Sequence, residues 1–334
     1  MTLTIKAVNP LDHVEEIKRL FVDNERPDFP EFFDRAYPTY VRAGGVSWVG
    51  RDAGGRVVMH VACFPQRFRF GARDVVGGLL VNALVARSHR SFFPAQALFK
   101  ITKHDARVRG DLDFLYTDPN DQAKAVLNVC GFTQVGTLGR YVLLLGDRRW
   151  LADRAIGLAH AARRIARRGA PLQARSAKDV SAGDFEAPTG DSPRLRPYHG
   201  GVRYAARLMG YPTSLDWWFT LQQNGDRGPP RRAGLLVRGP DSSGVAVLHA
   251  VRRDPGVPLG RLLPDVVATL RGQGGTRLQI WTLVDSLFAG ELWQTGFVLR
   301  DRAAPIVAAA LTAAGETVLR SPNLWEITSL DCDR

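Results

Sequence analysis

Hydrophobic residues in the first 145 positions follow two periods that alternate along the chain. Apolar residues that recur at every second position, or form short β-branched blocks, predict strands at 5–8, 46–51, 56–65, 66–70, 73–85, 113–117 and 134–145. Apolar residues at helical spacing predict helices at 11–22, 94–104 and 121–129. Counting the contiguous 56–65 and 66–70 as one strand, we therefore expect the order strand, two helical segments, three strands, helix, strand, helix and strand.

The segment 24–40 is interrupted by prolines and rich in aromatic residues. Pro27, Pro30 and Pro38 each lack a backbone donor and restrict the residue before them. The pattern predicts two short helices here instead of one regular helix. Such a segment is a candidate lid or wall of a substrate site.

The pattern after residue 200 repeats the order of the first half. Helices are expected at 202–209, 215–223, 262–271 and 286–294, and strands at 233–238, 244–252 and 277–283. In both halves a helix that follows a buried strand ends in Gly-Phe, at Gly131-Phe132 and at Gly296-Phe297. The repeated order predicts a duplicated structural unit.

Residues 147–200 differ from both halves in composition. An arginine-rich amphipathic helix is expected at 148–168, and the stretch at 169–197 is rich in Pro, Ser and Ala, which is typical of a linker. A solvated connector between domains explains this helix, and a membrane-surface helix or an RNA-binding helix has the same pattern. The sequence leaves these three interpretations open.

Composition narrows the class of protein. Of the 334 residues, 45% are hydrophobic and 23% charged, as in ordinary globular proteins, and no run approaches the roughly 18 apolar residues of a membrane span. The first residues lack the features of a signal peptide and the three cysteines lack metal-ligand spacing, so we expect a reduced, cytoplasmic protein. The net charge of +12 favours an anionic partner, such as a phosphorylated cofactor, a nucleotide-activated sugar, nucleic acid or acidic lipid, without choosing among them.

The chemistry of the chain concentrates in the loop and helix start at 85–98. A loop that enters a helix N-terminus offers free backbone N–H groups and the positive end of the helix dipole to an anion. Arg90 and Ala95 in this stretch, Asn120 before the next helix and Gly131-Phe132 after it resemble the acyl-CoA motif of the GCN5-related N-acetyltransferase (GNAT) superfamily. The resemblance extends over the first half of the chain.

This resemblance implies an α/β fold with a mixed sheet, in two tandem acetyltransferase-like domains that are each a twisted mixed β-sheet flanked by helices. The implied parts are an acyl-CoA-binding domain at 1–146, the basic helix and linker at 147–200, and a degenerate domain at 201–334. The implied cofactor is acetyl-CoA or another acyl-CoA. The residues expected to bind it are Leu84, Val85, Arg90, Ser91, Phe92, Phe93, Pro94, Ala95 and Asn120.

Three residues depart from the family pattern. Ser91 and Phe93 stand where the family has glycines, and a Cβ at each narrows the allowed φ range and the space for a phosphate. Leu127 stands where many members have a tyrosine that acts as general acid. Two interpretations follow: either the loop holds CoA with a rearranged grip, or this half has lost CoA and is a scaffold or uses another donor.

Four residues of the first half are candidates for general acid or base catalysis. His60 lies on a hairpin strand, Asn82 interrupts the apolar run of the central strand, and Asp113 and Tyr116 belong to the next strand. Each also has a structural interpretation, as a core histidine, a hydrogen-bonded buried asparagine, a strand terminator and a core tyrosine respectively.

The second half carries a further resemblance. Trp217-Trp218 and the segment 323–333 resemble signatures of tandem acetyltransferase-like proteins encoded with bacterial polysaccharide genes. This implies an amino sugar as the acceptor, although Asp331 and Asp333 also fit a solvated chain end. Because the segment 254–261 matches the phosphate loop poorly, we expect the second half to bind no cofactor and to close one wall of the substrate cleft.

These observations favour an acyl-CoA-dependent N-acyltransferase that acetylates a small-molecule amine, such as an amino sugar or a polysaccharide precursor. The amine attacks the thioester directly, and a backbone N–H near Leu84 or Val85 binds the oxyanion. One alternative is an aminoacyl-tRNA-dependent transferase of the peptidoglycan-bridge type, in which the basic helix at 148–168 binds the tRNA. Against this alternative, the chain has no long coiled-coil insertion. Another is a non-catalytic binding protein on a decayed transferase fold. The sequence does not determine the oligomeric state.

Overall fold

The computed structural model describes residues 3–146, 173–176, 192–197, 216–225, 228–254 and 257–328. Several predictions fall elsewhere. The helices expected at 148–168 and 202–209, and the acidic residues Asp331 and Asp333, lie outside the described residues.

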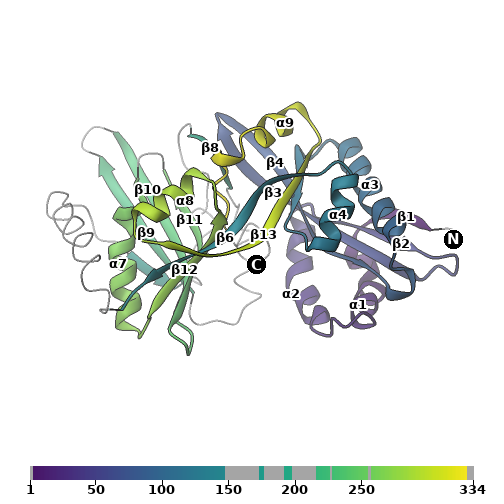
Figure 1. Ribbon diagram of the computed structural model, residues 1–334, viewed down its shortest axis with the longest axis horizontal. Helices are drawn as coiled ribbons and strands as arrows, with labels where there is room; N and C mark the ends of the chain where they lie inside the picture. The colour runs from purple at the N-terminus through teal and green to yellow at the C-terminus, as the bar shows by residue number, and fades with distance from the viewer. Residues whose placement is uncertain are drawn as a thin grey trace.

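The first half contains the elements that its hydrophobic pattern predicts, in the predicted order (Figure 1). They are β1 (Thr4–Val8), α1 (Val14–Val22), α2 (Phe29–Arg42), β2 (Val46–Arg51), β3 (Val57–Gly71), β4 (Arg73–Val85), α3 (Phe92–Arg109), β5 (Phe114–Thr117), α4 (Asp121–Val129) and β6 (Thr133–Leu144). Short 3-10 helices precede α1 and α3, at Pro10–His13 and Arg87–His89. The bounds of α4 are those that the sequence predicts.

The α2 helix corrects the prediction of two short helices at 24–40. It is one helix, with Pro30 in its first turn, where the missing N–H has no partner to lose, and Pro38 inside it. Phe29, Phe33 and Tyr37 on one side of α2 are each almost fully buried. Burial of each aromatic side chain contributes about 2 kcal/mol, and the three together exceed the roughly 3 kcal/mol that an internal proline costs.

The rest of the chain contributes seven strands and three α-helices within the described residues. They are β7 (Gln173–Ser176), β8 (Ser192–Pro197), β9 (Asp216–Gly225), β10 (Gly228–Arg238), β11 (Val245–Arg253), α7 (Leu259–Gly272), β12 (Arg277–Leu283), α8 (Leu287–Gln294), β13 (Val298–Ala310) and α9 (Ala313–Leu319), with a 3-10 helix at Pro322–Leu324. The predicted strand at 277–283 has the observed bounds. Strands β7 and β8 fall inside the stretch at 169–197 that the composition predicts to be a linker, so part of that stretch belongs to the sheet.

The helix predicted at 215–223 is wrong, because these residues form β9. The strand pairs antiparallel with β10 through most of its length, and with β7 on its other edge. Aromatic and β-branched residues prefer strands, and apolar residues in such a run also match helical spacing. Pairing with a neighbouring strand on both edges stabilises a strand here instead of a helix.

All strands of the described residues join one mixed sheet in which the two halves exchange a strand. The order is β1-β2-β3-β4-β5-β13-β6-β12-β11-β10-β9-β7, and β8 pairs with β3 beside this path. The last strand of the first half, β6, lies next to β12 of the second half, whereas β13 lies next to β5 of the first half. Figure 1 shows β6 and β13 crossing between the two lobes. Each half therefore completes the sheet of the other.

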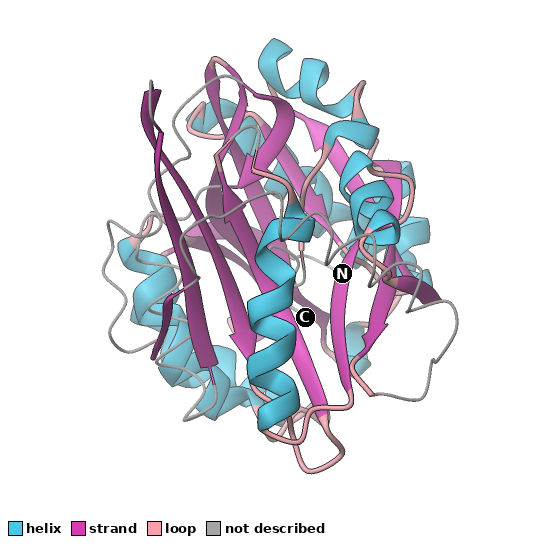
Figure 2. Ribbon diagram, turned by 90° about the vertical axis from the view of Figure 1, so that its left-hand side faces the viewer, coloured by secondary structure: helices cyan, strands magenta, loops and turns pink. Residues whose placement is uncertain are grey.

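The hydrophobic core follows the same exchange. Ile306 and Val307 of β13 belong to the core of the first half, and Tyr141 of β6 belongs to the core of the second. Helices cover both faces of the sheet (Figures 1 and 2). In the first half His60 contacts rings of α1 and α2, whereas Trp48 on the opposite face bonds to Asp105 of α3. The structure thus confirms the predicted mixed α/β class.

Candidate functional site

The central feature of the first half is an open edge on β4. Parallel pairing between β4 and β5 extends only from Gly77–Phe114 to Leu79–Tyr116. Beyond Leu79 no described strand pairs with this edge of β4, although its other edge stays paired with β3 to Val85. Ala83 is exposed, and Leu84 and Val85 are half-buried. The two parallel strands thus diverge and leave backbone groups of β4 accessible.

A β-bulge at Asn82 lies within this open edge. Pairing of β3 with β4 shifts between His60 and Ala62, and Asn82 has a left-handed φ of 52°. A non-glycine residue in this region costs about 1 kcal/mol. The side-chain amide of Asn82 donates to the Tyr37 hydroxyl at 3.3 Å. The bulge therefore places a polar, half-buried side chain where β4 leaves β5.

His60 supports this bulge from inside the fold. Its Nδ1 lies 2.9 Å from the carbonyl oxygen of Asn82 and its Nε2 lies 3.1 Å from the Ser47 hydroxyl. Because a carbonyl only accepts, Nδ1 carries the proton and Nε2 accepts from Ser47. Burial lowers the pKa of His60 to about 4. The predicted base candidate is thus a neutral, fully buried residue that holds Asn82.

The backbone at the end of β4 presents a donor to the open edge. The N–H of Ala86 donates to the carbonyl of Val58 on β3 at 2.8 Å. Successive N–H groups of a strand point to opposite edges, so the N–H of Val85 points away from β3. This is one of the two positions predicted for an oxyanion donor.

The loop after β4 leads into α3 without left-handed residues. Ser91, the residue before α3, is extended (φ −148°), and its side chain caps no backbone N–H. The first N–H groups of a helix have no acceptor within it. Phe92 and Phe93 are 43% and 76% exposed, so their side chains point to solvent. The loop adopts ordinary φ values, so its backbone conformation does not require glycine.

The other predicted cofactor residues surround the same loop. Arg90 is exposed, and its guanidinium reaches the Val85 carbonyl only at 3.5 Å. Pro94 and Ala95 are half-buried in the first turn of α3. Asn120 precedes α4 and its side chain accepts from the N–H of Ala123 at 2.9 Å, as a capping residue does. These residues flank the diverging strands from two sides.

Of the two remaining catalytic candidates, one is buried beside the point of divergence and the other lies away from the open edge. Tyr116 is fully buried, and its hydroxyl donates to Gln66 at 2.6 Å. The Asp113 carboxylate accepts from the Val76 N–H at 2.8 Å and from the Thr312 hydroxyl at 2.7 Å. Nine residues of β4 separate Val76 from Val85, which is about 30 Å along a strand. Asp113 therefore joins β4, β5 and α9 at the closed end of the strand pair.

Sequence reasoning missed the partners of these residues. Tyr37, Ser47 and Gln66 are buried polar groups that hold Asn82, His60 and Tyr116 respectively. One signal was available, a polar residue at an inward position of an alternating strand, which Gln66 provides between Phe64 and Phe68. Leu127, at the position of the family tyrosine, is a buried core residue.

A pocket of about 380 Å³ lies on the other side of this loop. Its lining is Glu16, Arg19, Leu20, Asp23, Asn24, Arg56, Val57, Ala86, Arg87 and Ser88. The charged groups pair within the protein, Arg51 with Glu16 at 2.6 Å and Arg87 with Glu25. The pocket is thus on the β3 side of β4, away from the diverging edge.

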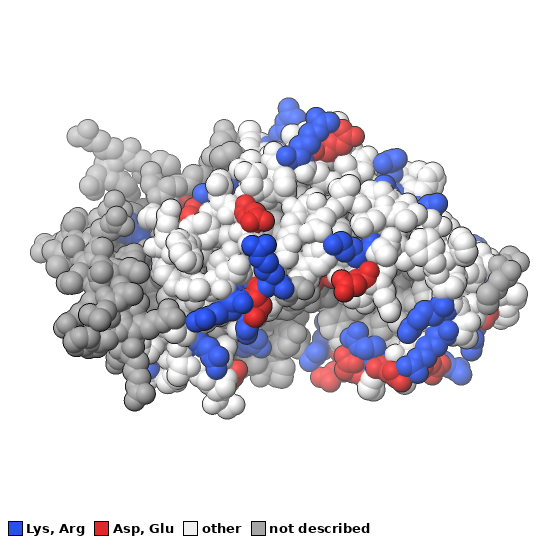
Figure 3. All heavy atoms as spheres, viewed as in Figure 1, with Lys and Arg blue, Asp and Glu red and all other residues white. Residues whose placement is uncertain are grey.

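Charges on one face of the molecule are mixed. On the face in Figure 3, basic and acidic side chains lie next to one another in both lobes. Nucleic-acid-binding surfaces instead gather basic residues into a patch or stripe. Within the described part of the chain, no helix is long and apolar enough to cross a membrane, and no group of acidic, His or Cys side chains is arranged to hold a metal.

In the second half two parallel strands also diverge, but the residues where they diverge are buried. Parallel pairing of β11 with β12 extends from Val245–Arg277 to Val247–Gln279, and a bulge follows at His249. From Leu248 to Arg253, however, every residue of β11 is buried. The guanidinium of Arg253 bonds to the Val257 carbonyl at 2.9 Å, within the segment that leads to α7. This groove is closed.

The endings of α4 and α8 match in geometry. Gly131 and Gly296 follow these helices with φ of 77° and 96°. The N–H groups of Phe132 and Phe297 each return to a carbonyl five residues earlier, at 3.0 Å. Left-handed glycine followed by an apolar residue is a common helix ending. The structure thus confirms the duplicated unit that the Gly-Phe pairs indicated.

Comparison with known proteins identifies the fold. No protein-family model and no curated protein matches the sequence. Among solved structures, a GCN5-related N-acetyltransferase from Kribbella flavida is 12% identical with a TM-score of 0.63, over 93% of this chain and 73% of that one. One from Anabaena variabilis is 10% identical with a TM-score of 0.58, over 93% and 74% respectively.

A tandem relative covers the whole architecture. The tandem GNAT protein from the clavulanic acid biosynthesis pathway is 15% identical with a TM-score of 0.52, over 93% of this chain and 99% of that one. Identities this low define the fold alone. The chain therefore has the mixed α/β fold of GCN5-related N-acetyltransferases in its tandem form, as the resemblance implied.

Proposed function

We propose that the protein is an acyl-CoA-dependent N-acyltransferase whose first half holds the acyl-CoA. The observation that carries this proposal is the open edge of β4 from Leu80 to Val85, which ends at an arginine-bearing loop and a helix N-terminus. The fold shared with solved N-acetyltransferases supports the same assignment.

The residues at this edge fit the chemistry of acyl-CoA. Arg90 and the N–H groups of Ser91, Phe92 and Phe93 offer a cation and free donors to a pyrophosphate. Bound acyl-CoA supplies the thioester carbonyl that an amine attacks. The N–H of Val85 is positioned to donate to an oxygen on this edge, where a preformed donor stabilises developing negative charge.

Transfer takes place directly to the acceptor amine. Both described cysteines are buried, and burial raises the pKa of Cys63 to about 12 and also raises the pKa of Cys130. A protonated, buried thiol is a poor nucleophile. The side chains of His60, Asp113 and Tyr116 form hydrogen bonds inside the fold. We therefore assign Asn82 to orienting the amine, and water accepts the proton of the amine.

The acceptor that we propose is a small-molecule amine of the amino-sugar class, including polysaccharide precursors. The support is the resemblance of Trp217-Trp218 and 323–333 to proteins encoded with bacterial polysaccharide genes. Acetyl is the proposed acyl group, in keeping with the acetyltransferases that share the fold.

A titration with acetyl-CoA tests the proposal. At a hundredfold excess over Kd, a ligand stabilises the folded state by about 2.7 kcal/mol, which thermal unfolding detects readily. Arg90→Ala should weaken this effect, whereas Arg320→Ala, which changes an exposed arginine directly after α9, should not. Absence of a shift at millimolar acetyl-CoA would contradict cofactor binding, and an unchanged Arg90→Ala affinity would place the pyrophosphate elsewhere.

A further inference from the structure

The groove between β11 and β12 is occupied by the chain itself. Residues 325–328, here called the strap, follow the 3-10 helix at Pro322–Leu324. Thr328 forms an antiparallel bridge with Thr282 of β12. Because the other edge of β12 pairs Thr282 with Gly139 of β6, this bridge lies on the edge that faces β11.

Both strands of the groove bind the strap. The Thr282 hydroxyl donates to the Ile327 carbonyl, and the Thr328 hydroxyl donates to the His249 carbonyl, both at 2.7 Å. His249 is the bulge residue of β11. Ile327 and Thr328 are 0% and 1% exposed. The strap therefore fills the second half at the place where β4 leaves an open edge in the first.

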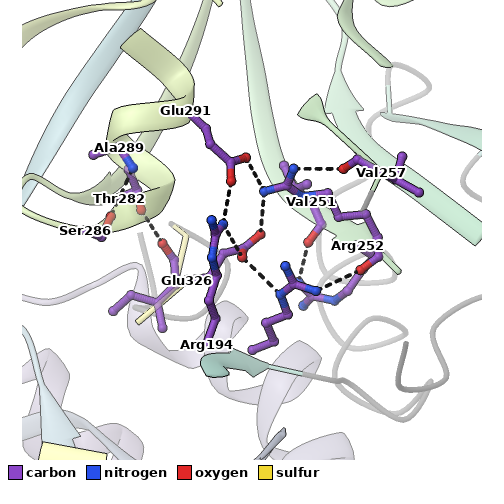
Figure 4. Close-up of polar contacts among 12 residues, drawn as sticks. Arg194, Val251, Arg252, Val257, Thr282, Ser286, Ala289, Glu291 and Glu326 are labelled. Carbon is purple, nitrogen blue, oxygen red and sulfur yellow. Dashed lines mark hydrogen bonds and ion pairs between the residues drawn. The ribbon is translucent and has the colours of Figure 1, made fainter. Parts of the chain in front are cut away.

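An acidic residue of the strap enters a cluster of arginines. The Glu326 carboxylate pairs with Arg196 at 3.1 Å, Arg194 at 3.4 Å and Arg253 at 3.5 Å (Figure 4). Glu291 of α8 pairs with Arg194 at 2.6 Å and with Arg253. Burial acts to raise the pKa of Glu326, and the three arginines outweigh it, so the pKa lies below its usual value. A buried cluster of this kind needs the carboxylate, because its removal leaves arginine charge uncompensated.

We propose that the groove between β11 and β12 is a binding site for an extended acidic polypeptide, and that the strap is its ligand within the same chain. Backbone pairing with β12 and the two threonine bonds hold an extended segment, as in recognition by strand addition. The arginines select a carboxylate one residue before the buried Ile327. The inference rests on these contacts and not on the proposed acyltransferase activity.

The strap also connects the second groove to the first half. Trp325 is fully buried against Phe114 and Tyr116 of β5, with ring centroids 5.6 and 6.4 Å apart respectively. Its indole N–H donates to the Val318 carbonyl at 3.1 Å. Occupation of the second groove therefore fixes a wall of the first half, next to the point where β4 and β5 diverge.

A chain cut after folding tests this site. A protease sequence inserted between Arg320, whose side chain is 80% exposed, and Pro322 permits cleavage of the folded full chain ahead of the strap. We expect the released C-terminal peptide to remain bound through gel filtration and to exchange with a labelled synthetic copy. A Glu326→Gln peptide should compete at least tenfold more weakly, whereas an Asn323→Ala control, altered at an exposed position before the strap, should compete fully.

Four results would overturn the proposal. The first is loss of the peptide while the remaining protein stays folded, and the second is equal competition by the Glu326→Gln peptide. Displacement of the peptide by acetyl-CoA would equally count against a polypeptide site. In the uncut chain, hydrogen exchange gives a second measurement, because Glu326→Gln should speed exchange of the amides at 248–253 at least tenfold. Unchanged exchange would also contradict the assignment.

Discussion

Strands β4 and β11 occupy equivalent places in the two halves and differ in what lies beside them. Each pairs in parallel with the next strand over three residues and then diverges at a bulge, at Asn82 and at His249. After the bulge Ala83 is exposed, whereas all of 248–253 is buried. The divergence is therefore a property of the duplicated fold, and the segment that fills it determines whether a ligand has access.

The arginine at or after the end of each strand also differs in its exposure to solvent. Arg90 is exposed beside the free N-terminus of α3. Arg253, at the end of β11, is only 5% exposed and pairs with Glu291 and Glu326. An arginine that is exposed in one half thus has its counterpart paired with carboxylates within the protein in the other.

The largest expected effect concerns the anchor of the strap. Trp325→Ala should lower the free energy of unfolding by about 3–5 kcal/mol, as for a large aromatic residue removed from a core. Trp293→Ala is the matched control, because Trp293 is 66% exposed, and should change it by less than about 0.5 kcal/mol. Urea denaturation measures both, and similar losses would show that Trp325 contributes no more than a surface residue.

The open edge of β4 is tested by removing one backbone donor. Val85→Pro deletes the N–H that faces this edge without breaking the pairing with β3, and should lower kcat about 100- to 1000-fold. Val85→Ala keeps the N–H and should stay within a few-fold of the original rate. Release of free CoA during acetyl transfer to a panel of amino sugars measures both. Equal rates for the two variants would remove Val85 from the site.

The buried histidine below the bulge predicts a pH dependence of stability. His60 has a pKa of about 4 in the fold and about 6.5 when unfolded, so below pH 6.5 the unfolded chain binds more protons. Stability is therefore full above pH 6.5 and falls by about 3 kcal/mol as the pH drops to 4. His60→Gln should abolish this loss of stability at low pH, as measured by urea denaturation at pH 7, 5.5 and 4. The exposed His104→Gln should retain it, and identical profiles for the two variants would refute the assignment.

The smallest expected effect compares equivalent helix caps. Asn120 caps α4 and Ser286 caps α8, each accepting from a backbone N–H three residues later. Asn120→Ala and Ser286→Ala should each cost about 1 kcal/mol of unfolding free energy. The same denaturation experiment measures them. A loss of unfolding free energy at only one of the two positions would show that the two helix caps contribute differently to stability.

Much of the fold could be predicted because it rests on local patterns. The ends of α4 and β12 agree with the predicted ends, since a helix cap, a left-handed glycine and a β-branched run act within a few residues. The sequence analysis predicted no element at β13 or α9, and it was wrong at α2 and β9. In α2 and β9, contacts with distant residues outweighed local preference: burial of Phe33 and Tyr37 in α2, and pairing with β10 in β9.

The candidate site was only partly accessible to sequence reasoning. The motif located Arg90, Val85 and Asn120 around one opening, because their order along the chain follows the order of elements in the fold. It gave no means to separate His60 and Tyr116 from catalytic groups. Their roles depend on Asn82 and Gln66, which are 22 and 50 residues away, and such partners leave no periodic signal.

The sequence by itself determined the order of elements in the first half, the mixed α/β class and the loop at the end of β4, because hydrophobic period and capping residues act locally. Only the tertiary structure decided the exchange of β6 and β13 and the occupation of the second groove by residues 325–328. Hydrophobic alternation identifies the buried face of a strand and leaves its edge partners undefined. Partners such as Tyr141 and Ile280, or Thr328 and His249, meet only when the whole chain has folded.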